Sequence, residues 1–132
     1  MKSMDIAASG MQAQSERLKL IAQNIANANS VSTEANGLPY RRKTISFKSV
    51  LDKQLGVEKV EVDKIGTDNS AYVQKYDPGN PTANPQGYIL LPNVNTLVEM
   101  TDMREAKAAY QANLSVIEMT KQMVARTLEL LR

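Results

Sequence analysis

The chain lacks three side chains that carry much of enzyme chemistry, because its 132 residues include no Cys, no His and no Trp. Without Cys and His there is no thiol or imidazole nucleophile, no Ser-His-Asp triad and no His or Cys metal site. The absence of Cys also rules out a disulfide framework. Among the residues that remain, no carboxylate pair and no Ser-Lys pair stands out as a catalytic couple. We therefore expect no enzyme activity, no catalytic residue, no cofactor and no metal site.

The chain also lacks a long apolar run and an excess of charge. No stretch of about 18 apolar residues is present, so we expect no direct membrane insertion. Asp5, Ser9 and Gly10 interrupt the first apolar residues, so we expect no cleavable signal peptide, and export would need another apparatus. Sixteen basic and fourteen acidic residues leave a formal charge of +2, which does not favour a dedicated nucleic-acid binder.

What the sequence does have is a seven-residue apolar repeat at each end. The N-terminal repeat predicts a helix from residue 3 to about 29, within an N-terminal segment of residues 1–30. Two heptad positions carry it, one with Met4, Met11, Leu18 and Ile25, and the other with Ala7, Ile21 and Ala28, interrupted by Gln14.

The C-terminal repeat is longer. Thr96 and Glu99 have the spacing of a capping box, and no Pro or Gly follows, which predicts a helix over residues 96–132 that is about 50 Å long. A second apolar row, with Met119 and Met123 among its members, lies about 100° round the helix from the main row. The main row steps by three and four through Met100, Met103, Lys107, Tyr110, Leu114, Ile117, Lys121, Val124, Leu128 and Leu131.

Residues 31–95 have a different pattern. Short β-like runs at 44–47, 57–62, 71–76 and 88–91 are separated by Gly56, by Gly66 and by two turns rich in Pro, Gly and Asn. The expected fold class is therefore mainly α, with long N- and C-terminal helices paired as a coiled coil and a small β/turn-rich middle segment.

The apolar rows have two interpretations. They are typical of the core of a self-contained helical bundle, but a bundle needs three or four helices and the middle segment supplies none. Two helices alone would leave an apolar flank exposed, so we expect other subunits to cover it. The candidate subunit-interface residues are Met4, Met11, Leu18, Ile21, Ile25, Met100, Met103, Tyr110, Leu114, Ile117, Met119, Met123, Val124, Leu128 and Leu131.

One basic cluster, Arg41-Arg42-Lys43, has aromatic neighbours in Tyr40 and Phe47. Basic and aromatic residues together are also what a single-strand nucleic-acid binder uses, so a nucleic-acid or polyanion module centred on Tyr40 to Lys48 is an alternative. No nucleic-acid-binding fold is recognisable around the cluster, which favours a salt-bridging surface or contacts with protein neighbours.

Four blocks of the sequence resemble the flagellar axial proteins, and within them the proximal rod proteins of the bacterial flagellar basal body. The third block is the most discriminating, because the general axial signature does not contain it. The sequence departs from the family at Asn84, where Asp is common, and at Ala108 or Ala109, where Arg is common. The blocks are Ala8 to Gln14 with Arg17 to Asn29, then Pro39 to Lys43, then Tyr76 to Pro81 with Gly87 to Asn95, and last Glu99 to Leu128.

The resemblance implies a structural subunit of the proximal rod that polymerises through its terminal helices into a torque-transmitting tube spanning the periplasm. It also implies export by the flagellar type III apparatus. The implied partners are further copies of the chain, other proximal and distal rod proteins, and the proteins of the MS-ring and export-gate junction, with no nucleic acid among them. Another subunit of the rod family is the alternative within this class.

Overall fold

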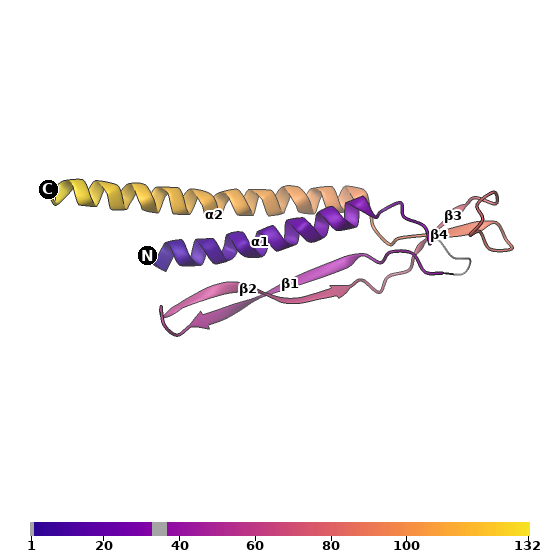
Figure 1. The fold of residues 1–132 in the computed structure, drawn as a ribbon, viewed down its shortest axis with the longest axis horizontal. Helices are drawn as coiled ribbons and strands as arrows, with labels where there is room; N and C mark the ends of the chain where they lie inside the picture. Colours follow the sequence, from indigo (N-terminus) through magenta and orange to yellow (C-terminus); the bar gives the residue numbers. More distant parts are fainter. Residues whose placement is uncertain (1, 33–36) are drawn as a thin grey trace.

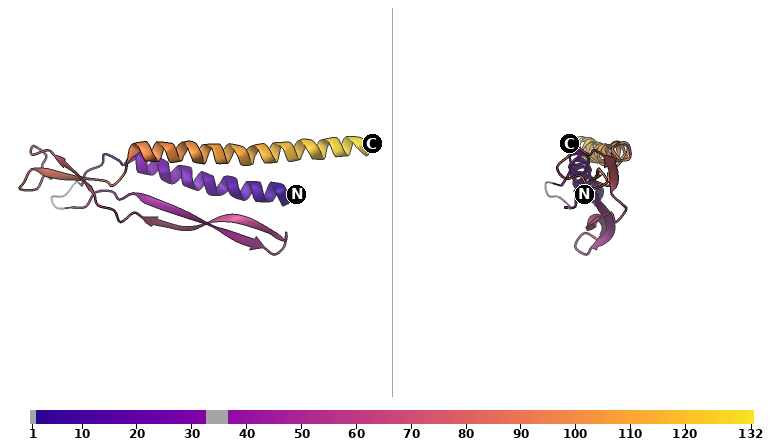
Figure 2. Two further views of the ribbon diagram at one scale, coloured as in Figure 1. Left: turned by 180° about the vertical axis from the view of Figure 1, so that it is seen from behind. Right: turned by 90° about the vertical axis from the view of Figure 1, so that its right-hand side faces the viewer.

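The computed structural model describes residues 2–32 and 37–132 of the chain. Two helices and two hairpins form an elongated molecule in which α1 lies between α2 and the longer hairpin (Figure 1). The shorter hairpin lies at the far end, beyond the start of α2 (Figures 1 and 2). The elements are α1 (Lys2–Ala26), β1 (Lys43–Asp52), β2 (Val57–Thr67), β3 (Val73–Tyr76), β4 (Tyr88–Leu91) and α2 (Thr96–Leu130).

The two helices run antiparallel and side by side, and the C-terminal end of α2 extends past the N-terminal end of α1 (Figure 1). Ser3 and Thr120 share a hydrogen bond of 3.4 Å between their hydroxyl oxygens. At the other end of the contact, the Arg17 guanidinium lies 3.6 Å from the Glu105 carboxylate and 4.0 Å from that of Asp102. These polar contacts fix the register of the two helices.

Small residues let the helices approach closely. A Cβ atom on Gly10 would lie only 2.7 Å from Nδ2 of Asn113, so the absence of a side chain at position 10 makes room for the Asn113 amide. Ala7 and Ala13 on α1 are almost fully buried, and Ala106 on α2 is 0% exposed. Close to Gly10 the contact between the two helices is therefore a narrow seam of small side chains, and the larger buried residues Leu20 and Ile21 lie further along α1.

The longer hairpin lies along the side of α1 that faces away from α2 (Figures 1 and 2). β1 and β2 pair antiparallel, with a bulge between Ser46 and Phe47, and the turn between them places Gly56 at a φ of 69° that favours glycine. The backbone N–H of Val60 donates a 3.2 Å hydrogen bond to the hydroxyl of Ser9, which ties β2 to α1.

The shorter hairpin pairs β3 with β4, from Val73 opposite Leu91 to Tyr76 opposite Tyr88. The Tyr76 and Tyr88 rings meet edge to face with centroids 5.3 Å apart. Ile89 is the buried residue of this hairpin. The two hairpins form separate two-stranded sheets.

The structure corrects three expectations about the fold. It is mixed α/β rather than mainly α, because β1 and β2 are each about twice as long as the predicted runs. Gly66 does not end a strand but lies within β2, opposite Thr44. The cap of α2 is Asn95, whose side chain accepts hydrogen bonds from the backbone N–H groups of Leu97 and Val98.

α2 continues well past the N-terminal end of α1 (Figures 1 and 2). Thr120 is the last residue of α2 that is buried, and it is the residue bonded to Ser3. Beyond it the apolar side chains are mostly exposed, with Leu128 at 60% and Leu131 at 77% exposure. The C-terminal end of α2 is thus a helical extension that little of the described chain covers.

Candidate assembly interface

The structure divides the fifteen candidate interface residues into two groups. Met4, Met11, Leu18, Ile21, Ile25, Met103, Tyr110, Ile117 and Val124 are buried or half-buried within the chain. The exposed group consists of Met100, Leu114, Met119, Met123, Leu128 and Leu131. Only the second group is fully available to another subunit in this conformation, so we restrict the candidate interface of the folded chain to it.

The division arises because α1 packs on a different row of α2 from the one predicted. The buried positions Glu99, Ala106 and Thr120, together with the Gly10 contact at Asn113, repeat every seven residues. Half of the predicted row lies on the same side of α2 as this buried row and is half-buried by α1. The other half of the predicted row lies away from α1 and is exposed. Sequence reasoning missed the buried row because its members are small or polar, although the strict heptad spacing was a signal that could have found it.

The exposed end of α2 carries both apolar and charged side chains, and most of its charges are positive. Its apolar side chains are accompanied by Lys121, Arg126 and Arg132 and by one carboxylate, Glu129. We call it the C-terminal apolar surface and define it by Met119, Met123, Leu128, Leu130 and Leu131, which are between 60% and 85% exposed. At about 100° per residue these side chains spread over roughly half of the helix circumference, and exposed apolar side chains gathered at one helix end are typical of a protein interaction site.

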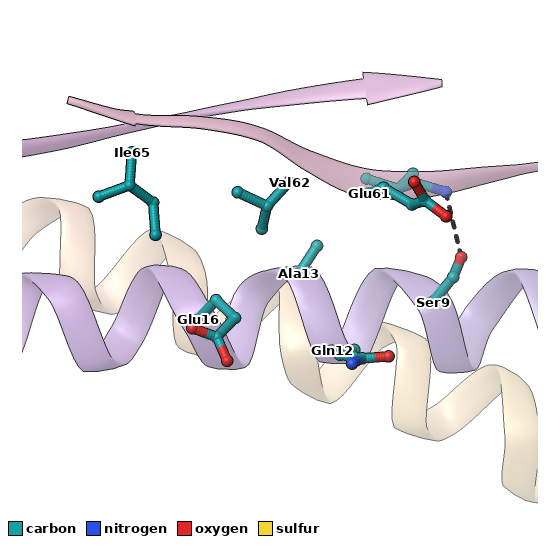
Figure 3. Close-up of a pocket in the computed structure, with 8 residues that line it drawn as sticks. Ser9, Gln12, Ala13, Glu16, Glu61, Val62 and Ile65 are labelled. Carbon is teal, nitrogen blue, oxygen red and sulfur yellow. Dashed lines mark hydrogen bonds between the residues drawn. The ribbon is translucent and has the colours of Figure 1, made fainter. Parts of the chain in front are cut away.

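A second open surface is a groove between α1 and β2, with a volume of about 360 Å³. Figure 3 shows Ala13, Val62 and Ile65 pointing into the space between helix and strand, while Gln12 and Glu16 lie along the helix side. We call it the α1–β2 groove and define it by Ser9, Gln12, Ala13, Glu16, Val60, Glu61, Val62 and Ile65.

The basic cluster lies at the junction of all the main elements. Arg42 Nε donates to Oε1 of Glu99, and its guanidinium also lies 3.4 Å from the Asp68 carboxylate and 3.8 Å from that of Asp102. The hydrogen bond with Glu99 is the main reason that the pKa of Arg42 is raised. Glu99 is only 1% exposed, so this ion pair joins the start of β1 to the start of α2 across the interior of the molecule.

The neighbours of Arg42 are engaged within the chain too. Arg41 Nη1 donates to the carbonyl oxygens of Asp68 and Ser70, both at 2.9 Å, and its guanidinium carbon lies 4.3 Å from the centre of the Tyr72 ring. Lys43 Nζ donates to Oε1 of Gln23 at 3.2 Å. The sequence predicted contacts with neighbouring subunits for these three cations. In the structure each of them binds a partner within its own chain, and contacts with other subunits stay a prediction.

Asn24 connects the same junction to α1. It is 0% exposed, and its amide exchanges two hydrogen bonds of 2.9 Å with the backbone of Lys43, as a neighbouring strand would. The Tyr40 hydroxyl donates to the same amide oxygen at 2.6 Å. Through these hydrogen bonds Asn24 positions the first residue of β1.

Tyr40 gives this junction a dependence on pH. Burial, followed by the negative charge of Glu99, raises the pKa of Tyr40 above its ordinary value. The neutral phenol therefore contributes stability that is complete below the unfolded-state pKa, near 10, and is lost as the pH rises through the higher folded-state pKa. We expect the stability difference between the wild type and Tyr40→Phe to shrink only in this alkaline range, as measured by urea unfolding at a series of pH values. A constant difference across the range would contradict this.

Neither a metal cluster nor a membrane-spanning helix is present in the described part of the chain. Among residues 2–32 and 37–132, no group of three or more acidic side chains is arranged to hold a metal ion. In the same residues, neither helix has a stretch both long enough and apolar enough to cross a membrane.

Comparison with known proteins matches both ends of the chain to rod-protein families. Residues 4–32 match the family described as flagella basal body rod protein. Residues 86–130 match the family described as flagellar basal body rod FlgEFG protein C-terminal. The first match includes almost all of α1, and the second includes β4 and α2.

Curated relatives named flagellar basal-body rod protein FlgC match over nearly the whole chain. The relative from Agrobacterium fabrum is 51% identical over 96% of this chain and 91% of its own length. The one from Salmonella typhimurium is 39% identical over 96% of this chain and 93% of its own. The one from Bacillus subtilis is 35% identical over 97% and 95%. The chain therefore belongs to the FlgC proteins of the flagellar basal-body rod family, and it is a structural rod subunit, not an enzyme.

Proposed function

We propose that this rod subunit assembles in the proximal rod by packing its terminal helices as a coiled coil against those of neighbouring subunits. The observation that carries the proposal is the C-terminal apolar surface, which is exposed on the part of α2 that extends beyond its contact with α1. An apolar helix end without a partner in its own chain contributes little to a monomer and much to an assembly.

The work of such a subunit is mechanical, because a rod transmits torque. Stiffness then depends on how firmly the helices and the hairpins are held together within each subunit. The Arg42–Glu99 ion pair and the Asn24–Lys43 hydrogen bonds join α1, β1 and α2 at one point. A subunit whose helices and longer hairpin are joined by these contacts would transmit force between them with little bending.

The route to the rod is part of the proposal. We infer that the flagellar type III apparatus exports the chain unfolded, and the absence of Cys means that no disulfide has to form after export. The proposed neighbours are other copies of the chain, other proximal and distal rod proteins, and the proteins of the MS-ring and export-gate junction. The cations of the 41–43 cluster would contact neighbours through the surface that their internal hydrogen bonds and the ion pairs of Arg42 leave free.

The alternative of a nucleic-acid module is disfavoured by the partners of the same cluster. A phosphate-binding Arg must be free to meet the backbone of a nucleic acid, whereas Arg42 is surrounded by the carboxylates of Glu99, Asp68 and Asp102. Filter binding with single-stranded DNA tests this. Tight binding that falls steeply with salt, and that is lost on changing Arg41, Arg42 and Lys43 to Ala, would support the module instead.

Complementation tests the proposed function. In a bacterium that has lost its own copy of this rod gene, we expect the wild-type chain to restore rod completion and swimming, scored by electron microscopy of isolated basal bodies and by motility in soft agar. The empty vector is the control. Failure of a chain that is expressed and exported to restore rods would overturn the proposal.

A further inference from the structure

We propose that the α1–β2 groove of one subunit receives the C-terminal apolar surface of a second copy of this chain, in a head-to-tail contact. The inference rests on the proposed function, because it names the partner surface for the exposed end of α2. It is carried by the shape, polarity, charge and dimensions of two surfaces that the chain leaves open.

The groove has apolar walls that the chain covers incompletely. Ala13, Val62 and Ile65 line it from both sides (Figure 3). Ile65 is 58% exposed and Val60 is 37% exposed, although both belong to the strand that lies against α1. Side chains of Leu or Met entering this space would remove apolar area from water on both partners.

The charges of the two surfaces are opposite. Among the described residues, those that line the groove include the carboxylates of Glu16 and Glu61 and no cation. Residues 119–132 carry Lys121, Arg126 and Arg132 against the single carboxylate of Glu129. Opposite charges at the rim of an apolar contact favour the correct partner and fix its orientation.

The dimensions of the two surfaces agree as well. The C-terminal apolar surface, from residue 119 to residue 131, extends for about 18 Å at 1.5 Å per residue. The strand that forms the floor of the groove runs from Val60 to Ile65, which is about 17 Å at 3.3 Å per residue. Three turns of helix therefore match the length of the groove.

A single chain cannot make this contact with itself. The C-terminal end of α2 points past the N-terminal end of α1, whereas the groove lies partway along α1 on the side away from α2 (Figures 1 and 2). The contact thus joins two different surfaces of two subunits. Such a heterologous contact need not close, and repetition of it generates the open helical assembly that a rod requires.

Disulfide crosslinking in basal bodies tests the contact, because the chain has no Cys of its own. We pair Gln12→Cys, in the groove, with Thr127→Cys, on the exposed end of α2; both side chains are exposed in the free subunit. Mild oxidation is expected to link the chain to a second copy. The matched control pairs Gln12→Cys with Ser115→Cys, an exposed position on the part of α2 beside α1, and should give about tenfold less product.

Charge reversal makes the test specific. Glu16→Lys with Glu61→Lys, or Lys121→Glu with Arg126→Glu, should each lower the yield of the crosslinked pair by about tenfold, and all four changes together should restore it. Completed rods that give no self-crosslink, or that link Thr127→Cys to a different rod protein, would overturn the inference and leave the proposed function standing. Failure of the wild-type chain to restore rods would overturn the proposed function itself.

Discussion

Changing both Leu128 and Leu131 to Ser is expected to abolish rod assembly while leaving the folded subunit nearly as stable as before. In the free subunit these side chains are 60% and 77% exposed, so removing them from the last turns of α2 costs little. In an assembly each Leu that becomes buried contributes on the order of 2 kcal/mol, and the loss is repeated at every subunit. Urea unfolding of the purified chain and complementation of the deletion strain measure the two effects separately.

Leu97→Ser provides a matched control for the loss of an exposed Leu from α2. Leu97 is 73% exposed at the opposite end of the helix, outside the C-terminal apolar surface. We expect this variant to lower rod completion much less than the double variant does. Normal rods and normal swimming in cells that carry the double variant would rule out a role for the C-terminal apolar surface in assembly.

Replacing Arg42 by Met is expected to destabilise the subunit by about 3 kcal/mol, the largest effect of any single change at the junction. Arg42 holds Glu99, which is 1% exposed and whose Oε2 has no hydrogen-bond partner among the described residues. Removing one partner of a buried ion pair leaves the other charge uncompensated, which typically costs several kcal/mol. Urea unfolding followed by circular dichroism measures the change.

Two further variants test whether the unpaired charge of Glu99 causes this loss of stability. Arg41→Met removes a neighbouring cation that stacks on Tyr72 and pairs with backbone carbonyls rather than with a buried carboxylate, so we expect it to cost less than half as much. Adding Glu99→Leu to Arg42→Met removes the unpaired charge and should recover much of the lost stability. An Arg42→Met variant as stable as Arg41→Met would show that the ion pair does not hold the junction together.

The elements of this fold could be predicted from the sequence where a local pattern determines them. Seven-residue apolar repeats predicted both helices, and Gly56, which has a positive φ in the structure, correctly separated the first two strands. The lengths of β1 and β2 could not be predicted, because their alternation is weakened by charged residues and by the bulge beside Phe47. The exposed residues of the C-terminal repeat were among the predicted interface residues, and their contacts with other subunits stay a prediction.

The packing of one element on another could not be predicted in the same way. The row of α2 that faces α1 contains Glu99, Ala106, Asn113 and Thr120, none of which is a large apolar residue. Its contacts depend on Gly10 and on polar side chains from the other end of the chain. The junction likewise brings Asn24, Arg42 and Glu99 together over long separations in sequence, and no spacing rule within a single segment connects them.

The accessibility of the C-terminal apolar surface before and after assembly tests the central claim most directly. Leu128→Cys gives a single thiol in a chain that has none, so maleimide label found on this chain after electrophoretic separation reports on that position alone. In the free subunit, where Leu128 is 60% exposed, we expect rapid labelling, and in isolated basal bodies that contain completed rods we expect the same thiol to be protected. Equal labelling of the free and the assembled subunit would contradict the account, because it would show that no neighbour covers the end of α2.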